Sequence, residues 1–154
     1  IGQLSALQVL ELGGNQITVL PASIGNLTNL LNVNLTNNKL TAIPADIGKL
    51  TKLQTLALGN NKLTSLPPEI GQLANLHTLA LSGNPQLNFT TVMSTLTSLK
   101  KLKSLNLSAN QLSSIPPDIG KLTTLEVLVL SGNKLSMEEQ EKVRKLLPNC
   151  EIKF

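Results

Sequence analysis

The sequence predicts a protein of the α/β class: a right-handed solenoid with a parallel β-sheet on its concave side and short helices or turns on its convex side. Three observations lead to this prediction. One pattern of apolar residues recurs along the chain, an asparagine holds a fixed place in that pattern, and the spacing is nearly constant. A fixed period of about 20 to 50 residues is typical of proteins built from stacked units.

The recurring asparagines define the units. They are Asn15, Asn38, Asn61, Asn84, Asn110 and Asn133, so the successive gaps are 23, 23, 23, 26 and 23 residues. Only the fourth unit departs from the period. Units 1 to 6 begin at Leu7, Leu30, Leu53, Leu76, Leu102 and Leu125. Residues 136–154 are predicted to form a C-terminal cap, and residues 1–154 form a single domain.

Unit 3 shows why each unit should form a strand and a turn. Leu56 and Leu58 are predicted to point into the solenoid and Ala57 to face solvent, because side chains alternate along a strand. The turn after the strand leaves backbone N–H and C=O groups that need partners. The amide of Asn61 can both donate and accept hydrogen bonds. We therefore expect the six asparagines to form a buried ladder.

The frame L-x-x-L-x-L-x-x-N-x-L resembles the leucine-rich repeat. Units 1, 2, 3 and 5 also carry P-x-x-I-G-x-L, which is similar to repeats of the plant intracellular Ras-group and bacterial type. The glycine of this motif is predicted to allow tight backbone packing on the convex side. The last residues, LLPNCEIKF, look like the C-terminal cap of such proteins in Leptospira and other bacteria.

This resemblance implies a role in protein–protein interaction, often at the boundary between host and pathogen. It implies no catalytic residues. It favours a secreted or surface-exposed bacterial protein, with a cytoplasmic location as the alternative.

Unit 4 lacks both the leucine–proline and the isoleucine–glycine pair. From Phe89, apolar residues recur at spacings of three and four up to Leu99, which predicts an α-helix. Asn88 is a suitable N-cap. We interpret this stretch as a longer convex helix in which Phe89 fills the place of the lost leucine. A specialised contact with a partner is the alternative.

The cap should contain a helix and a last strand. Ser136 to Glu139 fits a capping box, and Val143, Leu146 and Leu147 would form the apolar face of a helix over residues 137–147. A partial seventh strand is predicted at residues 150–152, with Cys150 as a small buried hydrophobe.

Composition excludes several classes of protein. The chain is 41% hydrophobic but 1% aromatic, so the core should be aliphatic. A single cysteine gives no intrachain disulfide, and no apolar run approaches the ~18 residues of a membrane span. The net charge of +4 is only mildly basic. The run Lys100, Lys101 and Lys103 lacks aromatic residues for base stacking, so binding to nucleic acid is not expected.

No residue pattern predicts catalysis, a cofactor or a metal. His77 and Cys150 are the only residues of their kinds, and they fall in different columns of the repeat. A structural zinc site needs about four ligands, usually Cys or His. There is no phosphate-binding loop and no dinucleotide fingerprint. We therefore expect no enzymatic activity.

Binding of a protein on the concave sheet is the function that remains, with a host protein as a partner class if the source is a pathogen. The outward positions of the strands give the candidate contact residues: Glu11, Leu31, Asn34, Gln54, Ala57, His77, Ala80, Lys103, Asn106, Val127 and Val129. This surface lacks Trp, Tyr and Arg, the usual interface anchors. The alternative is a structural segment that extends or caps a longer protein and has no ligand of its own.

The first six residues, IGQLSA, match the tail of a repeat. This predicts a chain that is the C-terminal part of a longer protein. It also predicts an open strand edge at residues 7–12, through which the chain could associate with itself.

Overall fold

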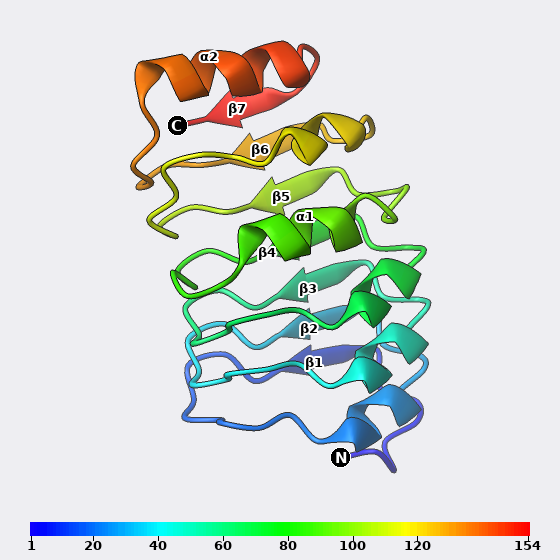
Figure 1. Ribbon diagram of the computed structural model, residues 1–154. Helices are drawn as coiled ribbons and strands as arrows, with labels where there is room; N and C mark the ends of the chain where they lie inside the picture. The colour runs from blue at the N-terminus through cyan, green and yellow to red at the C-terminus, as the bar shows by residue number, and fades with distance from the viewer.

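The computed structural model, which covers residues 1–154, is a solenoid with one parallel sheet of seven strands (Figure 1). The sheet order follows the chain: β1 (Val9–Glu11), β2 (Asn32–Asn34), β3 (Thr55–Ala57), β4 (Thr78–Ala80), β5 (Ser104–Asn106), β6 (Val127–Val129) and β7 (Glu151–Lys153). Equivalent residues of neighbouring units pair in the sheet, as Leu56 does with Leu79. The predicted seventh strand is confirmed, one residue later than expected.

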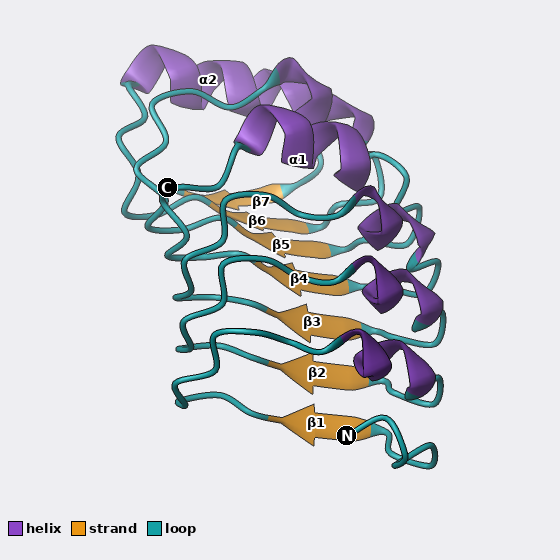
Figure 2. Ribbon diagram, turned by 60° about the horizontal axis from the view of Figure 1, so that its bottom comes forward, coloured by secondary structure: helices purple, strands orange, loops and turns teal.

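Helices cover the other side of the solenoid (Figure 2). Four are short 3₁₀ helices: η1 (Ala22–Asn26), η2 (Ala45–Lys49), η3 (Pro68–Gln72) and η4 (Pro117–Lys121). Two are α-helices: α1 (Phe89–Leu96) in unit 4 and α2 (Met137–Leu146) in the cap. A proline precedes each 3₁₀ helix, where a missing N–H costs nothing.

A single core of 38 buried hydrophobic residues lies between the sheet and the helices. Leu56 and Leu58 are fully buried, whereas Ala57 is half-buried, so the predicted facing of the strand is confirmed. Phe89 is the only aromatic residue in this core, which is otherwise mostly leucine.

The asparagine ladder links each turn to the preceding unit. The Nδ2 of Asn61 donates to the carbonyl oxygens of Leu58 and Leu35, both at 3.0 Å. Its Oδ1 accepts from the N–H of Leu40, also at 3.0 Å. Leu35 and Leu40 belong to unit 2, so one side chain satisfies backbone groups of two units.

The ladder is less uniform than predicted. The asparagines of units 2 to 5 are buried, but Asn133 is half-buried and Asn15 is exposed. Asn15 has no preceding unit beside it, and its Nδ2 donates only to Leu12 and Gly13 of its own turn. The expectation that all six are buried was therefore wrong at the two ends.

Glycine is required on the convex side where successive 3₁₀ helices touch. A Cβ atom on Gly25 would lie 2.7 Å from the carbonyl oxygen of Asp46. A Cβ atom on Gly48 would lie equally close, 2.7 Å, to that of Glu69. The predicted role of the isoleucine–glycine pair in tight packing is confirmed.

The helix predicted for unit 4 is present as α1. The Oδ1 of Asn88 accepts from the N–H groups of Thr90 and Thr91 at 3.1 and 3.3 Å, so Asn88 is the N-cap. Phe89 is buried and helps to fill the core, as expected. The helix ends at Leu96, before the Leu99 of the predicted pattern.

The cap differs from the prediction in its details. The Ser136 Oγ accepts from the Glu139 N–H at 3.2 Å, but the Glu139 carboxylate accepts from the N–H of Ile115, at 2.8 Å, instead of completing a capping box. Val143 and Leu147 are buried, whereas Leu146, whose side chain lies beside Gly120, remains 38% exposed. Cys150 is only half-buried.

Replacement of Leu58 should test the facing of the strand. We expect Leu58→Ala to lower the free energy of unfolding by roughly 2–5 kcal/mol, because it leaves a cavity in a packed core. Ala57→Ser, one residue away on the outer face, should change it by less than ~0.5 kcal/mol. Urea denaturation measures both, and equal effects would contradict the assignment.

The asparagine ladder can be tested with one substitution at two places. Asn61→Ala leaves buried backbone groups of two units without partners, so we expect a loss of roughly 2–4 kcal/mol in the free energy of unfolding. Asn15→Ala, at the exposed end of the ladder, should cost less than ~1 kcal/mol. Thermal and urea melts compare the two variants, and a similar loss in both would show that burial of the amide is not the cause.

Candidate functional site: the concave face of the sheet

The register of the sheet sorts the outward residues into columns. In each strand the middle residue points inward and its two neighbours point outward. The first outward column is Val9, Asn32, Thr55, Thr78, Ser104 and Val127, and the second is Glu11, Asn34, Ala57, Ala80, Asn106 and Val129. A third column precedes the strands: Gln8, Leu31, Gln54, His77, Lys103 and Glu126. Every member of the three columns is half-buried or exposed.

The middle of this face carries short, uncharged side chains. Ala57 and Ala80 are paired across β3 and β4, and so are Thr55 and Thr78. All four are half-buried. Because these side chains are short, a side chain of a partner can approach the backbone of the sheet closely in the middle of the face.

Charged groups lie toward the ends of the face and already have partners. The Nδ2 of Asn34 donates to the Oε2 of Glu11 at 2.8 Å. At the other end, the Lys103 Nζ lies 2.8 Å from the Glu126 Oε1. Exposed ion pairs of this kind contribute little to stability, so a binding partner can replace them at low cost.

Asn106 presents hydrogen-bond donors on this face. Its Oδ1 accepts from the N–H and the Oγ of Ser108, at 3.0 and 2.7 Å. This fixes the amide, while its Nδ2 makes no hydrogen bond within the protein. An oriented donor of this kind suits recognition of a carbonyl group.

The structure places all eleven predicted contact residues on this one face. Leu31, Val127 and Val129 are the apolar residues among them, and all three are half-buried in the outward columns. The prediction left out Val9, which is 48% exposed, and the paired threonines Thr55 and Thr78. Side chains alternate between inward and outward along each strand, and this alternation could have identified the three residues as part of the outward face. The role of all these residues in binding remains a prediction.

His77 and Cys150 lie apart, as the column assignment predicted. His77 belongs to the concave face, whereas Cys150 lies in the cap beside β7. Burial, together with the nearby charge of Glu151, raises the pKa of the Cys150 thiol. No group of three or more His, Cys, Asp or Glu side chains is arranged to hold a metal ion.

The lysines of the basic run contact different parts of the molecule. The Lys100 Nζ donates to the carbonyl oxygen of Thr97 at 2.7 Å, and the Lys101 Nζ donates to the Asn75 Oδ1 at the same distance, 2.7 Å. Lys103 instead pairs with Glu126 on the concave face. The three side chains therefore do not act together as one basic patch.

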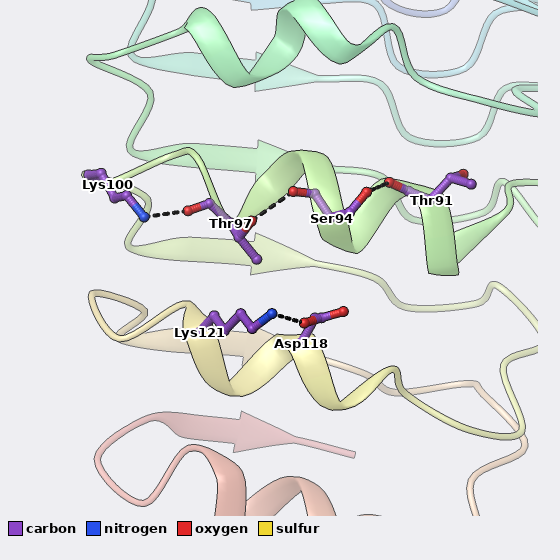
Figure 3. A network of polar contacts seen from close by, with 6 residues as sticks. All are labelled: Thr91, Ser94, Thr97, Lys100, Asp118 and Lys121. Carbon is purple, nitrogen blue, oxygen red and sulfur yellow. Dashed lines mark hydrogen bonds and ion pairs between the residues drawn. The ribbon is translucent and has the colours of Figure 1, made fainter.

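The convex side carries local polar contacts (Figure 3). On α1, the Ser94 and Thr97 hydroxyls donate to carbonyl oxygens of Thr91 and Ser94, both at 2.7 Å. On η2, the Lys49 Nζ lies 2.5 Å from the Asp46 Oδ1, and this contact lowers the pKa of Asp46. Asp118 and Lys121 form the same pair on η4. These groups are used within their own helices.

None of the helices combines the length and the apolar character that a membrane-spanning segment needs.

Comparisons with known proteins agree with this architecture. A family model described as a leucine-rich repeat region matches residues 32–151, and a model of two leucine-rich repeats matches residues 5–49. No curated protein matches the sequence. Many solved structures do.

One is a leucine-rich repeat protein of Leptospira interrogans, 41% identical with a TM-score of 0.89; the match covers 99% of this chain and 38% of that one. An internalin of Listeria monocytogenes is 30% identical with a TM-score of 0.81, covering 98% of this chain and 42% of the internalin. A plant peptide hormone receptor, solved in complex with RGF2, is 29% identical with a TM-score of 0.68, covering 86% of this chain and 26% of the receptor. The chain thus spans well under half the length of these proteins.

The raised pKa of Cys150 predicts a slow thiol. At a given pH a raised pKa leaves less thiolate, the form that reacts. We expect iodoacetamide to alkylate Cys150 more slowly at pH 8 than it alkylates a free cysteine peptide, and the rate to increase toward higher pH. Mass spectrometry of the intact chain measures the rate. A rate equal to or above that of the peptide would contradict the prediction.

Proposed function

Because this chain belongs to the leucine-rich repeat family, we propose that it is a protein-binding module whose partner lies on the concave face of the sheet. Proteins of this family typically act as interaction modules rather than as enzymes. The absence of catalytic activity in this chain is part of the proposal.

The low, uncharged middle of the concave face carries the proposal. Ala57 and Ala80, with the two threonines beside them, leave room for side chains of a partner directly over β3 and β4. The chain has no Trp or Tyr of its own. Large aromatic side chains usually supply most of the energy of an interface. In this complex, therefore, the partner supplies the anchoring side chains and the sheet supplies the site that receives them.

The apolar outward residues extend this site toward the ends of the sheet. Leu31 lies at the start of β2, and Val127 and Val129 lie on β6. The remaining predicted contacts are polar: Glu11, Asn34, Gln54, His77, Lys103 and Asn106. The face therefore offers apolar and polar contacts side by side, and both kinds occur in protein interfaces.

One neighbour supports binding of a polypeptide, because the plant peptide hormone receptor is solved in complex with RGF2. The two bacterial neighbours share the fold of this chain. A host protein as the partner class rests on the likeness to the Leptospira and Listeria proteins alone.

A second proposal is that the chain is a structural segment of a longer assembly. Its first strand, β1, lies at the end of the sheet, and Leu4, which precedes it, is exposed. A further unit or a second copy of the chain would cover Leu4 and pair with the strand edge. Sedimentation of the chain over a range of concentrations distinguishes self-association from a monomer.

Cross-linking from matched alanines can test the concave site. We expect a photoreactive amino acid at position 57 or 80 to capture one and the same protein from bacterial or host extracts. The exposed alanines Ala22 and Ala45, on the convex helices η1 and η2, are the controls and should capture none of it. Capture from the convex positions alone would overturn the proposal.

The captured protein allows a second test. The double substitution Ala57→Arg and Ala80→Arg fills the middle of the face with long charged side chains. We expect it to abolish binding of the purified protein, measured by calorimetry. The free energy of unfolding should change by less than ~0.5 kcal/mol, because both positions face outward. Full retention of binding would place the interface elsewhere.

A further inference from the structure

A groove lies on the lateral side of the solenoid, between unit 4 and unit 5. It has a volume of about 390 Å³ and is lined by Phe89 and Thr90 on one side and by Gln111, Ser113 and Ser114 on the other. None of its lining residues is charged. Its volume falls in the range of about 300–1,000 Å³ that is usual for ligand sites.

The groove exists because unit 4 has no extended stretch on this side. In unit 1, residues Thr18–Pro21 run beside Thr41–Pro44 of unit 2, and the hollow between them is only about 200 Å³. In unit 4 the equivalent positions include Phe89 and Thr90, which are already helical in α1. The stretch Ser113–Pro116 of unit 5 therefore has no extended neighbour on the side of unit 4.

One hydrogen bond between units is also missing here. In three of the four other pairs of units, the N–H after the repeat asparagine donates to the preceding unit: Lys39 to Ile17 and Lys62 to Leu40, both at 2.9 Å, and Lys134 to Leu112 at 2.8 Å. Unit 4 has Pro85 at this position and therefore has no N–H to donate. The equivalent donor of unit 5 is the N–H of Gln111. It makes no hydrogen bond within the protein, although it borders the groove.

The backbone is strained beside this donor. The residue before the repeat asparagine has a positive φ in every unit, as Ala109 does here with 55°, but only unit 5 has a second such residue, Gln111, with a φ of 60°. This conformation is unfavourable for residues other than glycine. Strained residues of this kind cluster at binding sites, where the surrounding structure holds them.

We propose that this groove binds an extended, uncharged peptide segment of a partner protein. The backbone of the segment lies beside Ser113–Pro116, and one of its carbonyl oxygens accepts from the N–H of Gln111. This is the addition of an extended peptide to an unpaired backbone edge. The site lies on the lateral side of the solenoid, so it is independent of the concave face.

The regular units indicate the side chains that fit. The stretch missing from unit 4 is present in units 1, 2, 3 and 5 as Thr18-Val19-Leu20-Pro21, Thr41-Ala42-Ile43-Pro44, Thr64-Ser65-Leu66-Pro67 and Ser113-Ser114-Ile115-Pro116. Each has a hydroxyl residue first, leucine or isoleucine third and proline last. A segment with this pattern would turn its aliphatic residue toward Phe89 and its backbone toward Gln111.

A titration followed by NMR tests the proposal. The probe is the peptide acetyl-Leu-Thr-Ser-Leu-Pro-amide, which has the sequence of residues 63–67, added to the ¹⁵N-labelled chain. We expect saturable shifts of the amide signals of Gln111, Ser113 and Ser114. The Gln111 proton should move downfield because it gains an acceptor, while the amides of β3 and β4 stay unchanged.

Three variants make the test specific. Ser114→Trp fills the groove and should weaken binding at least about tenfold, or about 1.4 kcal/mol. Ala42→Trp, at the equivalent exposed position of unit 2, should change the affinity less than about twofold. Gln111→Gly keeps the N–H and suits the positive φ, so it should retain binding. Circular dichroism checks that each variant is folded.

Several results would overturn the proposal. One is the absence of saturable shifts up to about 10 mM peptide, a concentration that would detect even very weak binding. Another is an equal loss of affinity in Ala42→Trp and Ser114→Trp. A third is a variant peptide, acetyl-Leu-Thr-Glu-Glu-Pro-amide, that binds as tightly as the probe, because burial of its two carboxylates in an uncharged groove should be unfavourable.

Discussion

The spacing of hydrogen-bonded parallel strands constrains everything else in this protein. Neighbouring strands lie about 4.7–4.9 Å apart, so each unit must fit that spacing on every side. On the helical side, glycines at Gly25 and Gly48 let successive 3₁₀ helices approach within a distance that no Cβ atom would allow. On the turn side, the asparagines hydrogen-bond two units at once. Because helices are wider than strands, the sheet lies on the inside of the curve.

Unit 4 shows how the fold accommodates an exception to this spacing. Its three additional residues leave the sheet undisturbed, since Leu79 of β4 still pairs with Leu105 of β5. The change is absorbed on the other sides: an α-helix replaces the 3₁₀ helix, and the Asn110 Oδ1 accepts from the N–H of Asn84 at 2.6 Å instead of from a residue two positions further along. The lateral groove is the space that remains. The three additional residues of unit 4 thus change the convex and lateral sides of the solenoid and leave the sheet unchanged.

The sequence was sufficient for the features that repeat. The leucine columns, the strand register, the facing of Ala57 and the outward columns of the concave face all follow from the period, because every unit supplies the same evidence. It was insufficient where one unit meets a neighbour of a different kind. The local sequence around Glu139 fits a capping box, but its carboxylate instead accepts a hydrogen bond from the N–H of Ile115 in unit 5. The positive φ of Gln111 has no signal in its residue type or in the repeat pattern, so the groove beside it could not be predicted.

The concave face separates binding from stability. The inward residues and the turns hold the fold, whereas residues such as Ala57 and Thr55 bury little and are free to differ between units. The distribution of charge then limits what can bind there. Glu11 and the Lys103–Glu126 pair lie toward the ends of the face, and the middle offers no charged partner. A partner that placed a charge over Ala80 would lose its hydration without a compensating ion pair, which is costly. The central anchor of the partner must therefore be uncharged, while its charges can meet those at the ends, where they would steer association more than add affinity.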